Sequence, residues 1–295
     1  KMDNASYSRS LLDLPVADIL VDHVAPYLTW KDLTTFRTCS RKCKELADQM
    51  FAGIRKLVLI YGYKRPKGPI PLILQTCRQL RMICLCAVTL SNDQVHQLMT
   101  NNLLLDTVNI NNCERITSRG LVPLVSCNKI KNLALFRMDI HDEFLIEFAN
   151  SNKKLKSVSF CQCYNFSVEA LQHFFRNEPE LERINLSGID IDISPVLTTI
   201  SQTSFNLMVI DVNGSILRDK NVLKNFTKNR RRVEFYIKCC DSDCEMLEEA
   251  GEEERVISRS YALHLWALKE LKCTDHTGLG LRFYLMILEI RNGWT

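Results

Sequence analysis

The sequence lacks a long hydrophobic run and the apolar core of a secretory signal peptide. Its most apolar stretch, 281–290, is far shorter than the roughly 20 residues that a membrane-spanning helix needs, and it contains Arg282 and Glu289. These two absences predict a chain without a transmembrane segment and without a membrane partner.

Motifs that carry chemistry are also missing. The sequence has no nucleophile elbow, no glycine-rich phosphate loop and no H-E-x-x-H pattern, and its 6 histidines are scattered. The net charge of +4 is small for 295 residues and does not by itself indicate nucleic acid or an anionic membrane. We therefore expect a protein that is not an enzyme and that uses no cofactor or metal.

Cysteine, in contrast, is abundant. An odd total of 13 without a signal peptide predicts reduced thiols in the cytoplasm, the nucleus or both. The pairs at Cys84–Cys86, Cys161–Cys163 and Cys239–Cys240 could hold a metal or form redox pairs, but none has the spacing of a structural zinc site. The favoured interpretation is that cysteine serves as a small buried hydrophobic residue.

The middle of the chain repeats an apolar triplet, L-x-x-L-x-L, every 25 or 26 residues. We call the first residue of each triplet the anchor, and the other two apolar residues follow at +3 and +5. The anchors are Ile54, Leu80, Leu105, Ile130, Leu155, Leu181 and Leu207. A period this regular predicts a stack of similar units, each of which needs its neighbours to bury its apolar face.

Each unit also predicts a turn and a helix. Position +8 is a small or pliable apolar residue in the five central units, namely Val88, Cys113, Met138, Cys163 and Ile189. A helical segment follows, with Ser91, Thr117 and Ser167 as candidate N-caps. The prediction is an α/β solenoid of about seven units over residues 54–238, with short strands on one side and helices on the other.

The regular stack is expected to fail near its end. Val233 keeps the period as an eighth anchor, but Lys238 then occupies an inward position. The run 218–232 is rich in basic residues, and a solvated helix is favoured over a phosphate-binding patch, so nucleic acid is an unlikely partner. Residues 239–255 are predicted to be an acidic linker, and 256–295 an anomalous tail that leaves the repeat period.

Ahead of the repeats, residues 11–50 predict three short amphipathic helices: Pro15–Ala25, Trp30–Thr38 and Ser40–Asp48. Asp13 is a candidate N-cap, with Pro15 in the first turn. Pro26 should kink or end the first helix. So few residues cannot build a large core alone, so their apolar faces indicate an interface.

This stretch resembles an F-box, and the repeats that follow resemble leucine-rich repeats of the cysteine-containing type. The F-box pattern is carried by Leu14, Pro15, Ile19, Leu20, Val24, Leu28, Leu33, Phe36 and Cys39. Cys43 departs from it, because many relatives carry an aromatic residue there. Residues 11–238 are thus similar to the F-box and leucine-rich-repeat family, nearest to its small jetlag-type members.

The resemblance implies a substrate-recognition adaptor of an SCF-type E3 ubiquitin ligase. The F-box residues above would bind Skp1, and through it a cullin–RING ligase, while the repeats would hold an unidentified protein for proteasomal degradation. The alternative is a stand-alone leucine-rich-repeat scaffold or inhibitor whose N-terminal helices cap the stack. An F-box should leave four side chains partly exposed, whereas a cap should bury them against Ile54 and Leu57: Leu14, Ile19, Leu33 and Phe36.

A target would meet the concave face, where strand residues at +2, +4 and +6 point. An exposed Phe136 beside Arg137 is typical of an interface hot spot, whereas the repeated asparagines could simply solvate the strands or bond to neighbouring turns. The predicted target-binding residues are Asn109, Asn111, Phe136, Arg137, Ser159, Arg183, Asn185 and Asp211.

Overall fold

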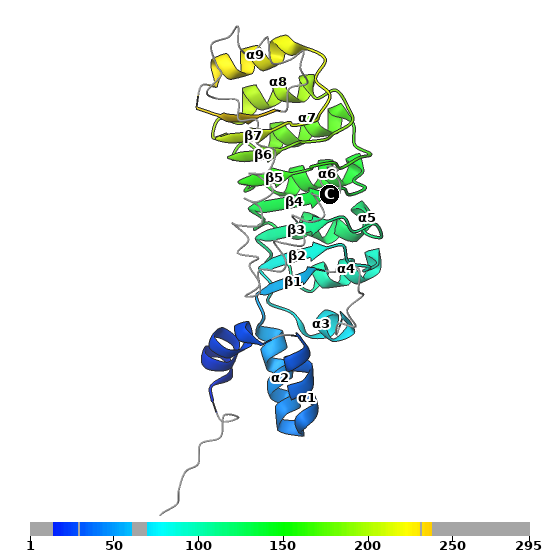
Figure 1. The fold of residues 1–295 in the computed structure, drawn as a ribbon, viewed down its shortest axis with the longest axis vertical. Helices are drawn as coiled ribbons and strands as arrows, with labels where there is room; N and C mark the ends of the chain where they lie inside the picture. Colours follow the sequence, from blue (N-terminus) through cyan, green and yellow to red (C-terminus); the bar gives the residue numbers. More distant parts are fainter. Residues whose placement is uncertain (1–13, 29, 61–69, 231, 238–295) are drawn as a thin grey trace, which may run out of the picture.

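A computed structural model describes residues 14–28, 30–60, 70–230 and 232–237 of the chain. An 8-stranded parallel sheet, in the order β1 to β8, forms an open stack, and helices α4 to α9 line one face of it (Figure 1). The strands are β1 (Lys56–Ile60), β2 (Met82–Cys86), β3 (Thr107–Asn111), β4 (Asn132–Phe136), β5 (Ser157–Ser159), β6 (Arg183–Asn185), β7 (Val209–Asp211) and β8 (Glu234–Tyr236).

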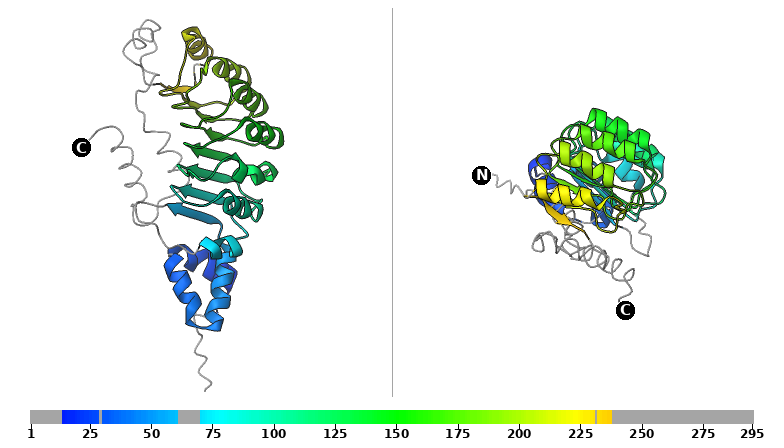
Figure 2. Two further views of the ribbon diagram at one scale, coloured as in Figure 1. Left: turned by 90° about the vertical axis from the view of Figure 1, so that its right-hand side faces the viewer. Right: turned by 90° about the horizontal axis from the view of Figure 1, so that it is seen from above.

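One helical segment follows each of the strands β1 to β7 and returns the chain to the next strand. Figure 2 shows that these segments lie along the same side of the stack. They are α3 (Ile70–Thr76), α4 (Asn92–Thr100), α5 (Ser118–Leu121) continued by the 3₁₀ turn η4 (Val122–Ser126), α6 (Asp142–Ser151), α7 (Val168–Asn177), α8 (Ser194–Thr203) and α9 (Lys220–Asn229).

The strand register confirms the predicted inward rows. The +3 residues pair laterally from Leu57 through Val108 and Ile184 to Phe235, and one continuous apolar core runs beneath them. The anchors from Leu80 onwards and the five +8 residues are buried in the same core. The repeat period therefore determines which side chains enter the core, because successive strands stack in register.

The prediction for the eighth unit was wrong by one residue. Phe235 pairs with Ile210 and is buried, and Ile237 packs against the core beside it. Val233 also packs against this core, as its predicted role as an anchor requires, but the next inward residues come one position earlier than the period expects. A turn in which the Val233 N–H bonds to the Arg230 carbonyl (3.0 Å) leads into β8. The stack remains regular through β8, and Lys238 lies outside the described residues.

Two of the three predicted N-caps are present. Ser91 forms a capping box with Gln94, and the Ser167 hydroxyl accepts a hydrogen bond from the Ala170 N–H (3.1 Å). Thr117 does not cap its helix. Its N–H and hydroxyl bond instead to the side-chain amide of Asn92 (2.9 and 3.1 Å), which ties neighbouring units together.

Position +7 of the units has left-handed backbone, a feature that the sequence analysis missed. The φ angles are 50–53° at Ala87, Asn112, Arg137 and Gln162, and 67° and 71° at Gly188 and Gly214. The N–H of each +7 residue from Ala87 to Gly188 bonds to the +6 carbonyl of the next unit at 2.8–3.0 Å. The lateral hydrogen bond holds residues other than glycine in this conformation despite its steric cost.

Glycine at +7 should therefore contribute measurably to stability. We expect Gly188→Ala to lower the free energy of unfolding by about 1–2 kcal/mol, because the new Cβ adds left-handed strain and lies 2.7 Å from Gln162 Cγ. Gly214→Ala meets no atom within 4 Å and should show the strain alone, about 1 kcal/mol. Urea denaturation would measure both, and equal losses would refute the steric contribution.

The described cysteines are free thiols and most of them are buried. Burial raises the pKa of Cys113 and of Cys163 to about 12, and both thiols donate to backbone carbonyls, which supports the predicted role as core residues. The pair Cys239–Cys240 lies outside the described residues.

These thiols should differ sharply in reactivity. Alkylation at about pH 8 should modify the exposed Cys39 in the folded protein, while Cys113 and Cys163 stay unmodified until the chain unfolds, because a buried thiol with so high a pKa forms almost no thiolate. Peptide mass spectrometry over time would measure this. Labelling of Cys113 at the rate of Cys39 would contradict it.

Candidate protein-binding surfaces

The N-terminal helices form a small unit at one end of the stack (Figure 1). They are η2 (Val16–Val24), the 3₁₀ turn η3 (Ala25–Tyr27), α1 (Trp30–Cys39) and α2 (Arg41–Gly53). Within η2 the Ala25 N–H bonds to the Leu20 carbonyl, five residues back, which is π-helical spacing. This helix ends at Val24, close to Pro26, as predicted, and a 3₁₀ turn follows. Pro15 lies at its N-cap rather than inside its first turn. Asp13 lies outside the described residues.

The unit has its own apolar core. Its buried members come from all of its helices, and Ile54 and Leu72 join this core to the first repeat. Gly53 lets η2 approach closely, because a Cβ there would lie 2.7 Å from a Val21 methyl carbon. The buried residues are Leu20, Ala25, Leu33, Leu46, Met50 and Phe51.

Two polar features fix α2 within this unit. The Arg37 guanidinium donates to both carboxylate oxygens of Asp48, at 2.6 and 3.4 Å, and so connects α1 to α2. The Ser40 hydroxyl caps α2 by accepting the Cys43 N–H, and the helix extends to Gly53, beyond the predicted end at Asp48. The ion pair was not predicted, because nothing in the sequence alone places residues 37 and 48 side by side.

The nine predicted docking residues fall into two groups. Leu20 and Leu33 are buried in the core of the unit and stabilise it. The other seven keep exposed surface: Pro15 and Cys39 are exposed, and Leu14, Ile19, Val24, Leu28 and Phe36 are partly exposed.

The exposure of the four side chains that should distinguish an F-box from a simple cap agrees only in part with an F-box. Leu14, Ile19 and Phe36 remain partly exposed, as expected of a docking surface, whereas Leu33 is buried. The partner of Leu33 is the core of the N-terminal unit, and Leu57 belongs to the separate core of the repeats.

The concave strip offers less side-chain surface than expected. Four of its eight predicted residues are buried: Asn109, Asn111, Asn185 and Asp211. Each lies between the side chains of strands on either side; Asn185, for example, is in register with Ser159 and Asp211. Short polar side chains in such rows shield one another from solvent.

Two of the buried residues bond to their own turns. Asn185 Oδ1 accepts from the N–H and hydroxyl of Ser187 (2.9 and 2.6 Å), and Asp211 Oδ1 accepts from the Asn213 N–H (2.9 Å). Among the asparagines of the strip, Asn185 thus matches the turn-bonding alternative, whereas Asn109 Oδ1 has no hydrogen-bond partner among the described residues. Burial raises the pKa of Asp211 to about 6, although the Asn213 N–H opposes the change.

The remaining concave residues form the accessible part of the strip. Arg137 is exposed, whereas Phe136, Ser159 and Arg183 are partly exposed, so Phe136 is less open than the sequence indicated. The left-handed conformation of Arg137 (φ 53°) places this residue at the turn that leaves β4.

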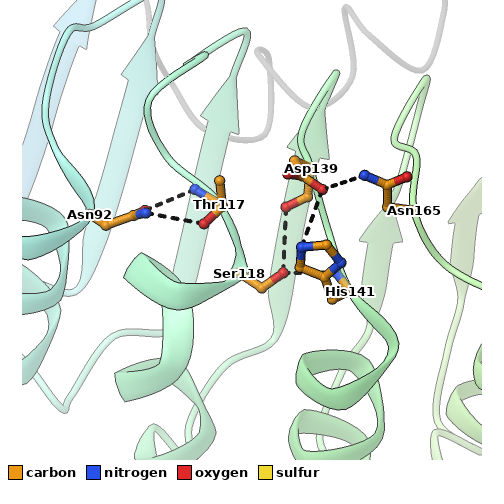
Figure 3. A network of polar contacts seen from close by, with 6 residues as sticks. All are labelled: Asn92, Thr117, Ser118, Asp139, His141 and Asn165. Atoms are coloured by element: carbon orange, nitrogen blue, oxygen red, sulfur yellow. Dashed lines mark hydrogen bonds and ion pairs between the residues drawn. The ribbon is translucent and has the colours of Figure 1, made fainter.

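Figure 3 shows a polar network beside the helix starts that contains serine, histidine and aspartate. Ser118 Oγ accepts from the His141 backbone N–H (2.7 Å), and His141 Nε2 lies 3.6 Å from Asp139 Oδ1. Asp139 also accepts from Asn165 Nδ2 (2.8 Å). Because Ser118 bonds to the backbone rather than to the imidazole, the network links neighbouring units and lacks the contact that activates a nucleophile.

Among the described residues, no group of three or more histidine, cysteine or acidic side chains could hold a metal ion. No helix in the same ranges is long and apolar enough to cross a bilayer.

No family model matches the chain, and no curated protein matches it. Among solved structures, a chain of the yeast Rad7–Elc1 complex superposes with a TM-score of 0.55 at 14% identity, over 67% of this chain and 53% of that one. The fold is a leucine-rich-repeat solenoid. This chain spans about half the length of the matched chain from the Rad7–Elc1 complex.

A second solved structure is an internalin, InlF, from Listeria monocytogenes. It gives a TM-score of 0.41 at 13% identity, over 76% of this chain and 78% of that one. At 14% identity, the likeness to the chain of the Rad7–Elc1 complex concerns the fold of the solenoid alone.

Proposed function

We propose that this protein is a substrate-recognition adaptor of an SCF-type E3 ubiquitin ligase, acting in the cytoplasm or nucleus. The observation that carries the proposal is the N-terminal unit, which buries a small core of its own yet keeps seven of the nine predicted docking residues at least partly exposed. Ile19 is partly exposed and does not belong to the apolar residues packed on that core. Such a face is suited to the surface of Skp1, and through it to a cullin–RING ligase.

In this role the chain supplies no catalytic group. The solenoid would hold a target protein through the accessible concave residues Phe136, Arg137 and Arg183, close to the charged ubiquitin-conjugating enzyme. Its contribution to rate is the raised effective concentration of the target lysines. The likeness to a chain from a two-protein complex agrees with a protein-binding role.

The direct test is binding to purified Skp1. The full chain should bind, and Ile19→Ala should weaken binding by about tenfold, because it removes an apolar contact without opening the core. Val122→Ala is the matched control, because Val122 is an apolar residue 45% exposed on the repeats, and it should change affinity by less than about twofold. Circular dichroism would verify that both variants are folded.

A folded wild-type chain that does not bind Skp1 would refute the adaptor role. The second candidate function, a stand-alone scaffold whose N-terminal helices close the stack, would then be favoured. One observation supports it: Ile54 and Leu72 join the N-terminal core to the repeats. A scaffold of this kind would retain the concave binding residues and lose only the connection to the ligase.

A further inference from the structure

The loops that lead into the first five strands carry a row of basic residues that no function described above uses. We define the basic edge as Arg55, Lys56, Arg81, Lys129, Lys131 and Lys154, all of which are exposed. In the sequence these residues are scattered over about 100 positions. They occupy positions −1 to +2 around their anchors, so the repeat brings them to one side of the solenoid.

Hydrogen bonds between the units hold this row together. The Arg81 N–H donates to the Arg55 carbonyl (2.7 Å), the Asp106 N–H to the Arg81 carbonyl (2.9 Å), and the Lys131 N–H to the Asp106 carbonyl (2.8 Å). Neighbouring positions therefore lie at strand spacing, roughly 4.8 Å. The backbone positions of Arg55, Arg81 and Lys131 are therefore fixed relative to one another.

The charges of this array are largely uncompensated. Among the described residues, none of the six basic side chains forms an ion pair, and Asp106 is the acidic residue at the corresponding loop positions of these five units. The edge ends where Lys156 pairs with Glu180 (3.1 Å) and Glu182 (3.4 Å). Six like charges on one side of the solenoid, interrupted by Asp106 alone, repel one another, and a bound polyanion would relieve this repulsion.

Two exposed leucines indicate which polyanion fits. Leu103 and Leu104 are each 44% exposed and lie in the third unit, between the basic residues of the second and fourth units. A phosphate backbone has no apolar group to cover them, and no exposed large aromatic side chain lies among the described loops of this edge for base stacking. An acidic polypeptide with apolar side chains matches both features.

We propose that the basic edge is a docking surface for an acidic polypeptide segment of a partner protein. The chain's own acidic run, 241–254, is not the expected occupant. The last unit adjoins this run in the chain, and its helix α9 carries the exposed basic residues Lys224 and Lys228, which lie much nearer to the run in sequence than the basic edge does. This proposal is independent of Skp1 binding.

The test measures fluorescence anisotropy of a labelled peptide of about 12 residues, rich in glutamate with two leucines, against the full chain. The triple variant K129E/K131E/K154E should bind about tenfold more weakly. The matched control, K224E/K228E/R232E, makes the same change in net charge at exposed sites of the last unit and should change affinity by less than about twofold. Leu104→Ser should weaken binding by about threefold.

Three outcomes would overturn the proposal. Equal losses in the two triple variants would indicate a general charge effect. Tighter binding of a DNA duplex of about 20 base pairs than of the peptide would identify nucleic acid as the ligand. A gain above about threefold in peptide affinity, after glutamates 248, 249 and 252–254 are changed to glutamine, would show that the chain's own acidic run covers the edge.

Discussion

Phe174→Ala is expected to lower the free energy of unfolding by about 3–5 kcal/mol. Phe174 is fully buried, and its ring lies 5.2 Å from the ring of Phe160, which directly follows β5, and 5.3 Å from the Phe175 ring beside it, both edge to face. Phe148 of the preceding helix stacks on it at 6.4 Å. The substitution thus opens a cavity at the point where two units meet, and neighbouring aromatic rings cannot refill it.

Urea denaturation followed by circular dichroism would measure this loss. Phe205→Ala is the control, because Phe205 is 72% exposed and its contact is with the Arg230 guanidinium, 4.8 Å from the ring centre, so its loss should cost under about 1 kcal/mol. Similar losses in the two variants would contradict the assignment of Phe174 to the interface between units. A broadened transition would indicate that units beyond the cavity unfold separately.

Glu178→Gln should stabilise the protein, increasingly so at high pH. Glu178 is fully buried at the end of α7, and neither carboxyl oxygen has a hydrogen-bond partner among the described residues. Burial raises its pKa from the usual 4.5 to about 8, although the Lys153 charge opposes the change. Glutamine keeps the shape of the side chain and removes the cost of burying a charge.

The direction of the pH dependence follows from proton binding. Between pH 4.5 and about 8 the folded chain holds a proton on Glu178 that the unfolded chain has released. The stability contributed by this group is therefore complete below the lower value and is lost as the pH rises through the upper one. The gain of Glu178→Gln over the wild type should grow by about 1.4 kcal/mol per pH unit in this range and level off above it.

Unfolding measured from pH 5 to pH 9 would check this slope. Glu180→Gln is the matched control, because Glu180 is exposed and pairs with Lys156, and it should give a nearly flat difference. A pH-independent effect of Glu178→Gln would mean that the carboxyl group is ionised in the folded state, with an ordinary pKa.

The occupants of the Glu178 position vary between units. Asn102 and Asn152 occupy the corresponding positions of earlier units, and Asn102 bonds to the Leu80 N–H (2.9 Å) and to the Cys77 and Leu98 carbonyls (3.1 and 2.8 Å). A carboxylate can accept but not donate, so only the protonated acid could bond in the way the asparagine amide does. The burial of Glu178 was not predicted, because this residue lies outside the repeating apolar positions. A glutamate there leaves the apolar period unchanged.

The sequence by itself determined the rows of the core. Residues at the anchor, +3, +5 and +8 are apolar in almost every unit, and a chain with that period can hide them only by stacking its units in register. The N-terminal helices were predictable for a similar reason, since the apolar spacing of 3.6 residues and the prolines Pro15 and Pro26 are local signals.

Only the tertiary structure decided which polar residues are accessible. Asn109 and Asn185 are buried because neighbouring strands flank them, whereas Arg81 and Lys131 gather into the basic edge because hydrogen bonds between units align their loops. The left-handed turns at Ala87 and Arg137 depend on the same lateral bonds. Apolar burial follows from a periodic pattern along the chain, but the surroundings of a polar side chain are set by residues about 25 positions away, which no local pattern encodes.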